Sequence, residues 1–274
     1  MTVSVADTKP RVTLTVAAGV ADVRLNRPEK RNALDLAMVS ALVTIGEQLK
    51  ARSDVRAVVL SGEGPCFCAG LDTSAFQAAR EGRPHAEATD LPPSDGPAQA
   101  AGQRAAYVWT ELPVPVIAAV RGNALGGGLQ IALGADIRIV APNARLAMLE
   151  VVWGLVPDLA GTQLLPQLVR LDVAKELTFT GRVVSGEEAV RIGLATRVAA
   201  DPLTAAFDLA KEIAGRSPAA VRAAKGLIGL AGKTTMRTAL EQERAQNLEL
   251  AGTPNQLEAV RARLDGREPR FTDQ

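Results

Sequence analysis

The spacing of apolar residues predicts strands early in the chain and helices later. Residues 12–16 and 20–25 are short β-favouring runs joined by a small-residue turn, which indicates a hairpin. From 35 to 52 apolar residues recur at mostly helical spacing, and Asp35 near the start suits a helix N-terminus. Further apolar runs predict largely buried strands at 55–60, 114–120 and 137–140.

The second half of the chain is dominated by helical patterns. From about residue 172 they recur, most clearly at 201–216, 218–230, 236–250 and 254–264. Residues 80–102 contain several prolines and glycines and have no clear period, so we expect a loop long enough to act as a lid. Strands and helices alternating early, then accumulating helices, predict an α/β protein.

Composition narrows the class of partner. The chain has 31 Lys and Arg against 30 Asp and Glu, so its net field favours neither nucleic acid nor an anionic membrane. The longest uncharged run, residues 122–135, is shorter than the roughly 20 apolar residues that span a bilayer. The first residues lack the apolar stretch of a secretory signal, so we predict a cytoplasmic protein with no membrane contact.

The cysteines and the histidine offer little chemistry. Cys66 and Cys68 are too closely spaced for an unstrained disulfide, and with His85 as the one histidine a Cys/His zinc quartet is impossible. We therefore expect no metal site. His85 lies in the irregular loop with nothing to orient it towards a thiol, so we interpret Cys68 as a packing residue.

Two small-residue stretches follow predicted strands. Residues 122–130 include three successive glycines before a helical turn expected at 129–133, and residues 67–72 end in an acidic residue suited to open a helix. Glycines there would let a ligand approach free backbone N–H groups. A tight strand-to-helix crossing is the alternative reading. Neither stretch has the pattern of a phosphate loop or a dinucleotide fingerprint.

The order of these motifs resembles the crotonase (enoyl-CoA hydratase/isomerase) superfamily over residues 12–264. The resemblance rests on LNRP at 25–28 leading to NAL at 32–34, FCAGLD at 67–72, NALGGGLQ at 123–130, ADIRI at 135–139 and the later GLVPD and GTQ. It implies a ββα spiral core over residues 1–200 and a helical C-terminal region over 201–274. That region would close the pocket and assemble the chain as a homo-trimer or hexamer.

The resemblance also implies a coenzyme A thioester as substrate, so coenzyme A is part of the substrate and no separate cofactor is expected. At the matching positions, the backbone N–H groups of Leu71 and Gly127 form an oxyanion hole that stabilises a thioester enolate. The implied coenzyme A contacts are Arg27, Arg31, Ala33, Ala69 and Gly70. Solvated surface charge is the alternative for the two arginines.

Carboxylates decide between the reactions of this family. Its hydratases resemble one another in carrying two glutamates, and the matching positions here hold Gln130 and Glu150. Asp158 follows eight residues after Glu150, and Gly154 and Pro157 permit a bend between them. The Glu150 and Asp158 pair resembles that of the dienoyl-CoA isomerases, although those enzymes carry an additional acid where this chain has Gln130. An amide is no ordinary proton acceptor at neutral pH.

Double-bond isomerisation is therefore the first functional hypothesis. Hydration of a trans-2-enoyl-CoA is the second, with Gln130 positioning water and Glu150 serving as acid and base. A non-catalytic binder of acyl-CoA or RNA is a third, and the balanced charge and 3% aromatic content disfavour RNA. Structural alternatives stay open for the three side chains: a surface carboxylate for Glu150, a turn residue for Asp158 and a plain helix residue for Gln130.

Overall fold

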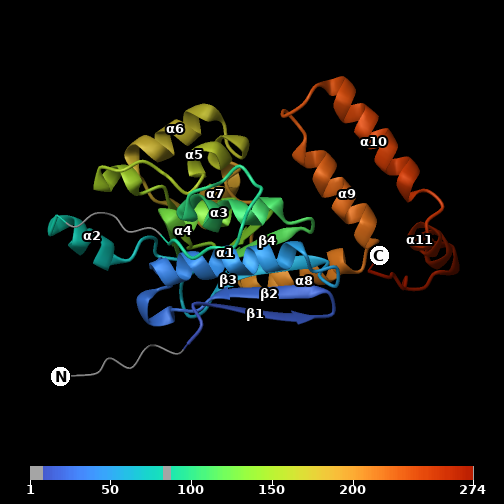
Figure 1. Cartoon of the computed structure of the whole chain (residues 1–274), viewed down its shortest axis with the longest axis horizontal. Helices are drawn as coiled ribbons and strands as arrows, with labels where there is room; N and C mark the ends of the chain where they lie inside the picture. The colour runs from blue at the N-terminus through green and yellow to red at the C-terminus, as the bar shows by residue number, and fades with distance from the viewer. Residues whose placement is uncertain (1–8, 83–87, 274) are drawn as a thin grey trace.

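A computed structural model describes residues 9–82 and 88–273 (Figure 1). Its main sheet has the strand order β1-β2-β3-β4-β6-β9. The strands are β1 (Val12–Ala17), β2 (Val20–Leu25), β3 (Ala57–Gly62), β4 (Val116–Val120), β6 (Ile137–Val140) and β9 (Arg197–Val198). The predicted hairpin is confirmed, because β1 and β2 pair antiparallel with Val12 opposite Leu25. All other neighbours in this sheet are parallel.

A second sheet continues from the ends of β4 and β6. It has the order β5-β7-β8, formed by β5 (Asn123–Leu125), β7 (Arg145–Ala147) and β8 (Val184–Ser185). Neither these strands nor β9 were predicted from the sequence. Each has only two or three residues, too few to show a period.

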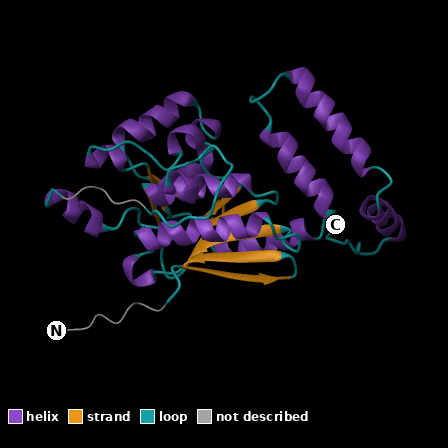
Figure 2. Ribbon diagram, viewed as in Figure 1, coloured by secondary structure: helices purple, strands orange, loops and turns teal. Residues whose placement is uncertain are grey.

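Helices cover both faces of the main sheet (Figure 2). Helix α1 (Leu36–Lys50) packs against α3 (Ala101–Glu111), and the side chains of Val58 and Leu60 on β3 belong to the same core. The alternate β3 residues Ala57 and Val59 pack instead with α8 (Pro202–Ala214). Successive side chains of a strand point to opposite faces, so the apolar run at β3 is buried on both sides.

Local sequence explains where helices begin. Asp35 is the N-cap of α1 and accepts a hydrogen bond from the N–H of Met38 at 2.8 Å. Asp72 likewise accepts from the N–H of Ser74 at 2.8 Å, at the start of α2 (Thr73–Arg80). Residues 88–100 contain no helix or strand, and residues 83–87 of the predicted lid lie outside the described residues. The lid remains a prediction.

Short helices surround the second sheet. Helix α4 begins at Gly127, two residues before the expected turn, and all of its residues are buried. The helices of this region are α4 (Gly127–Leu133), η2 (Glu150–Trp153), α5 (Gly161–Leu164), η3 (Leu165–Gln167), α6 (Leu171–Thr180) and α7 (Gly186–Arg191). A further short helix, η1 (Pro28–Lys30), lies before α1.

The last three helices stand to one side of the sheets (Figure 1). They are α9 (Pro218–Gly229), α10 (Met236–Leu250) and α11 (Pro254–Asp265), close to the predicted bounds. α8 lies beyond the predicted boundary at residue 200 and yet packs on the main sheet, so the helices that stand apart begin at α9. Arg56, the residue before β3, forms an ion pair with Asp273 in the C-terminal segment. No helix in the described ranges is long and apolar enough to cross a membrane.

Candidate active site

Two loops at the carboxyl ends of β3 and β4 lie side by side. A parallel bridge joins Cys68 to Ala124, and the N–H of Leu125 donates to the carbonyl oxygen of Cys68 at 3.1 Å. Because β3 and β4 are parallel neighbours, their carboxyl ends meet at one edge of the sheet. The stretches 67–72 and 123–130 are therefore brought together.

Glycines permit this close approach. A Cβ at Gly128 would lie 2.5 Å from the carbonyl oxygen of Cys68, and a Cβ at Gly70 would lie 2.6 Å from that of Leu125. Gly70 has φ +91° and Gly126 has φ +51°, conformations that L-residues rarely adopt. A larger residue at position 70 or 128 would force the loops apart.

The N–H groups of Leu71 and Gly127 have no acceptor in the part of the chain that the structure describes. In the bridge between Leu34 and Leu71, the hydrogen bonds involve Gly70 and Asp72, which leaves the Leu71 N–H unused. Gly127 is the first residue of α4, where an N–H has no partner within the helix. A Cβ at Gly70 would lie 4.0 Å from the nitrogen of Gly127, so the two donors lie close together.

Glu150 opens η2, shortly after β7, and contacts Gln130 on α4. The Nε2 of Gln130 donates to Oε1 of Glu150 at 2.6 Å, whereas the buried Oε2 has no partner among the described residues. Burial raises the pKa of Glu150, the hydrogen bond from Gln130 opposes this rise, and the negative charge of Asp158 adds to it. A carboxyl group in this setting holds its proton to a higher pH than an exposed glutamate does.

The carboxyl group of Glu150 lies next to the glycine loop. A Cβ at Gly126 would lie 3.2 Å from Oε1 of Glu150, so this carboxyl group lies beside the residue that precedes the Gly127 donor. Asp158 is exposed and lies in the loop between η2 and α5, near enough for its charge to act on Glu150. That loop bends at Ala160, whose φ is +64°.

Gln130 makes further contacts that the sequence did not indicate. Its side chain is completely buried, and its Oε1 accepts hydrogen bonds from the N–H groups of Leu159 and Gly161, both at 2.9 Å. The amide thus joins Glu150 to the loop that carries Asp158. A glutamine that binds backbone N–H groups 29 and 31 residues away leaves no signature in the sequence.

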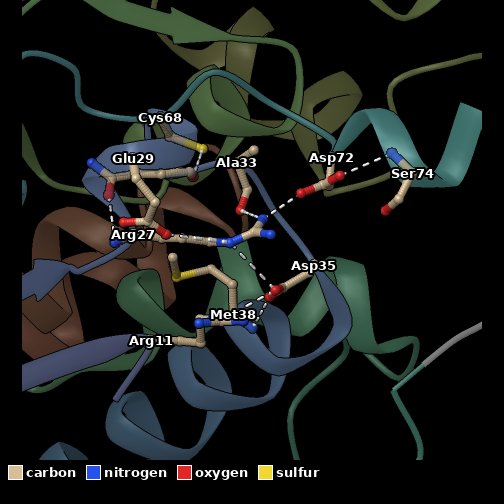
Figure 3. Close-up of polar contacts among 10 residues, drawn as sticks. Arg11, Arg27, Glu29, Ala33, Asp35, Met38, Cys68, Asp72 and Ser74 are labelled. Atoms are coloured by element: carbon tan, nitrogen blue, oxygen red, sulfur yellow. Dashed lines mark hydrogen bonds and ion pairs between the residues drawn. The ribbon is translucent and has the colours of Figure 1, made fainter. Parts of the chain in front are cut away.

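Arg27, expected to meet coenzyme A phosphate, has partners within the protein (Figure 3). Its guanidinium pairs with Asp72, lies 3.6 Å from Asp35 and donates to the carbonyl oxygen of Ala33 at 3.3 Å. Burial acts to raise the pKa of Asp72, but hydrogen bonds from Ser74 and Arg27 lower it to about 2. With its side chain 13% exposed, Arg27 serves here as a structural link; its contact with coenzyme A remains a prediction.

The other expected coenzyme A contacts lie in two adjoining segments. The N–H of Ala69 donates to the carbonyl oxygen of Arg31 at 3.0 Å, and the N–H of Leu34 donates to that of Gly70 at 2.8 Å. Ala33 is buried, whereas Arg31 is exposed. These positions therefore lie together, next to the Leu71 donor.

Asn32 fixes this corner, although from the sequence it was named only within the NAL motif at 32–34. Its side chain is buried, accepts from the Arg27 N–H at 2.8 Å and donates to the carbonyl oxygens of Glu63 and Cys66. Asn32 has φ +57°, a conformation that asparagine tolerates better than most residues. The available signal for this role was the residue type itself, because asparagine is common at such positions.

Nucleophilic thiol chemistry has no support in this site. Burial raises the pKa of Cys68 to about 12, and its thiol donates to the carbonyl oxygen of Asn32 at 3.0 Å. Cys66 is also a buried free thiol. His85 lies outside the described residues. Among the residues the structure does describe, no three His, Cys, Asp or Glu side chains gather as a metal site would require.

Hydrophobic residues near Glu150 divide into two groups. Met148 is buried and lies against Gly161, consistent with core packing. Val152 and Trp153, which could line an acyl pocket or belong to the core, have 61% and 57% of their surface exposed in the single chain.

Comparison with known proteins gives consistent matches. Residues 15–274 match the model of the Enoyl-CoA hydratase/isomerase family. YngF of Bacillus subtilis (strain 168), whose name places it among the enoyl-CoA hydratase/isomerases, is 37% identical over 88% of this chain and 89% of its own. The mitochondrial Delta(3,5)-Delta(2,4)-dienoyl-CoA isomerase of Rattus norvegicus is 33% identical over 91% of this chain and 77% of its own.

Solved structures agree with the fold. The crystal structure of an enoyl-CoA hydratase from Bacillus anthracis has a TM-score of 0.84 and 31% identity, covering 96% of this chain and 100% of that one. The expected ββα fold with a helical C-terminal region is therefore confirmed. The names of the relatives include both hydratases and an isomerase, so they leave the reaction open.

Proposed function

The chain belongs to the enoyl-CoA hydratase/isomerase family and is an acyl-CoA-processing enzyme of that family, and from this premise we propose that it isomerises conjugated acyl-CoA double bonds. The substrate class that fits best is a 3,5-dienoyl-CoA, converted to the 2,4-dienoyl-CoA. The observation that carries the proposal is the buried Glu150 carboxyl group, with its unpartnered Oε2, within the electrostatic reach of Asp158.

The thioester oxygen binds the N–H groups of Leu71 and Gly127. When a proton leaves C2, the electron pair spreads over the conjugated chain onto this oxygen, which becomes an enolate oxygen. Donors fixed in place stabilise the enolate more than the ground-state carbonyl. The free state of both N–H groups and their proximity support this assignment.

Two carboxyl groups then move the protons. The carboxylate of Asp158 takes the proton from C2, and Glu150, whose pKa burial raises, gives a proton from Oε2 to C6. The double bonds move from positions 3 and 5 to positions 2 and 4, and no water is added. This leaves Asp158 protonated and Glu150 ionised, so the cycle closes when Asp158, which is exposed, returns its proton to solvent and Glu150 takes one up before the next turnover.

Hydration is the competing reaction within the family. It would need Gln130 to position a water molecule, yet this side chain is completely buried and contacts Glu150, Leu159 and Gly161. The structure thus favours isomerisation. A non-catalytic acyl-CoA binder would lack turnover on both substrates.

We also propose that the C-terminal helices contact further copies of the chain, giving a homo-trimer or hexamer. They expose large apolar side chains, of which Ile228, Met236 and Leu264 have 76%, 74% and 81% of their surface exposed. Sedimentation equilibrium tests the stoichiometry, and a monomer at micromolar concentration would contradict it. The cytoplasmic location stays a prediction.

The experiment gives purified protein a 3,5-dienoyl-CoA and, separately, a trans-2-enoyl-CoA. The ultraviolet spectrum follows conjugation and mass spectrometry follows water addition. We expect isomerisation of the diene without gain of mass, lost in Asp158→Asn and retained in Asp54→Asn, which changes an exposed aspartate paired with Arg52. Hydration of the enoyl ester with the diene untouched would refute the proposal.

A further inference from the structure

Gln130 uses both ends of its amide within the protein. Its Nε2 donates to Oε1 of Glu150 at 2.6 Å, and its Oε1 accepts from the N–H groups of Leu159 and Gly161 at 2.9 Å each. The side chain has no exposed surface. Gln130 thus contacts the Glu150 carboxyl group directly and, through the backbone of Leu159 and Gly161, the loop that carries Asp158.

The two oxygens of Glu150 consequently differ. Oε1 accepts from Gln130 and lies beside Gly126, whereas Oε2 is buried and has no partner among the described residues. A buried carboxylate oxygen without a donor is costly, and such groups in native structures call for an explanation. Proton exchange with a bound substrate supplies one, because only Oε2 is free to take part in it.

We propose that Gln130 is a positioning residue, which orients Glu150 so that Oε2 is its proton-transferring oxygen and holds the loop of Asp158 in place beside it. This role differs from that of a group that binds water or substrate. The reaction that Gln130 would serve rests on the proposed function, whereas the orientation of the Glu150 carboxyl group is a property of the free enzyme. The identity of residue 130 follows from the geometry: one end must donate and the other must accept.

A carboxylate at this position meets only half of that requirement. In Gln130→Glu one oxygen still accepts from Leu159 and Gly161, but the other faces Oε1 of Glu150 at hydrogen-bond distance. Two carboxylate oxygens this close share a proton and titrate as a coupled pair. Gln130→Met, of similar length, removes the donor and the acceptor together. The two variants therefore separate the two functions of the amide.

The test measures the free enzyme first. Carbon-13 NMR of labelled glutamate follows the titration of Glu150, assigned by its loss in Glu150→Gln, and hydrogen exchange follows the Leu159 and Gly161 amides. In Gln130→Met we expect the Glu150 midpoint to rise by about one to two pH units, because a hydrogen bond that favours the ionised form is lost. We expect both amides to exchange more than about tenfold faster.

In Gln130→Glu the two amides should keep their protection while Glu150 titrates in two coupled steps. Gln163→Met, which changes an exposed glutamine on α5, is the matched control and should alter neither readout. With the diene as substrate, kcat of Gln130→Met should fall about 10- to 100-fold with little change in KM, as expected for misplaced catalytic groups.

An unchanged Glu150 midpoint in folded Gln130→Met would overturn the inference, and so would a raised KM with an unchanged kcat, which would make Gln130 a substrate contact. Should Gln130→Met fail to fold, an unchanged single-step titration in Gln130→Glu would overturn it equally. Titration and exchange need no substrate. A correct titration without turnover of the diene would therefore count against the proposed reaction and leave the positioning role intact.

Discussion

The guanidinium of Arg27 forms an ion pair with the carboxylate of Asp72 and so joins the turn before Ala33 to the residue after Leu71 (Figure 3). Both side chains are largely buried, with 13% and 10% of their surface exposed. Asp72 also accepts from the N–H of Ser74. The pair thus fixes the segment of the expected coenzyme A contacts relative to one of the two free N–H donors.

Neutralising Asp72 should cost more stability at neutral pH than in acid. Its pKa of about 2 lies below the ordinary value of 3.8, so the ionised form stabilises the fold above about pH 4, and this contribution is lost as the pH falls towards 2. Asp72→Asn should lower the free energy of unfolding by about 2 kcal/mol at pH 7. Urea unfolding at pH 7 and at pH 3 measures the difference.

The control for that experiment is Asp54→Asn, whose carboxylate pairs with Arg52 on the surface and should contribute little. If the free energies of unfolding of Asp72→Asn and wild type differ by the same amount at both pH values, the ion pair does not act through the charge of Asp72.

A methyl group at position 128 should separate the two loops. The Cβ of Gly128→Ala would lie 2.5 Å from the Cys68 carbonyl oxygen and 2.8 Å from the Cys68 Cβ. We expect kcat to fall on the order of 10²-fold, as for loss of one oxyanion donor, and stability to drop by about 1 to 3 kcal/mol. Steady-state kinetics and thermal melting measure both.

Gly226→Ala is its matched control, because a Cβ there meets no atom within 4 Å and alanine favours a helix over glycine by about 1 kcal/mol. Full activity in Gly128→Ala would show that the spacing of the loops does not matter to catalysis.

Replacing Glu150 should lower activity without lowering stability. Glu150→Gln should lower kcat on the order of 10²- to 10⁴-fold. Burial raises the pKa of Glu150, so the stability tied to its protonated form is present below about pH 4.5 and is lost as the pH rises through the raised pKa. The variant should therefore gain stability relative to wild type between pH 4.5 and pH 8. Melting temperatures across this range provide the measurement, and a relative loss at pH 8 would contradict the assignment.

Thiol reagents should leave the folded enzyme active. The Cys68 thiol is buried and its pKa is about 12, so almost no thiolate exists at pH 8. We expect iodoacetamide to modify Cys68 in urea and not in buffer, as followed by mass spectrometry. Rapid inactivation of the folded protein with labelling at Cys68 would refute this.

Sequence patterns located the elements that are long or capped. The hairpin and the helix at 236–250 were predicted at or within one residue of their bounds, because their periods extend over whole elements. Helix α3 was missed at Ala101–Glu111, since it follows an aperiodic stretch and its N-cap, Ala100, makes no side-chain hydrogen bond. The strands β5, β7, β8 and β9 are too short to show alternation.

The site was predictable as a set of positions and not as an arrangement. Motif order indicated Glu150, Asp158 and the two glycine-containing loops. The bend between Glu150 and Asp158 includes Gly154, whose φ of +71° fits the glycine named from the sequence, whereas the left-handed Ala160 just beyond Asp158 has a conformation that no residue type specifies. The contacts of Gln130 with backbone N–H groups likewise depend on the path of that loop, so the sequence suggested a water-binding amide instead.

The bridge between Cys68 and Ala124 is made by main-chain atoms, as are the two free N–H groups beside it. Exchange of side chains elsewhere leaves such atoms in place as long as the glycines remain. The part of the site proposed to hold the thioester is thus made of main-chain groups, whereas the part proposed to move protons is made of side chains. A chain built in this way can acquire a new reaction through the exchange of one or two carboxylates, while the main-chain donors proposed to stabilise the enolate stay unchanged.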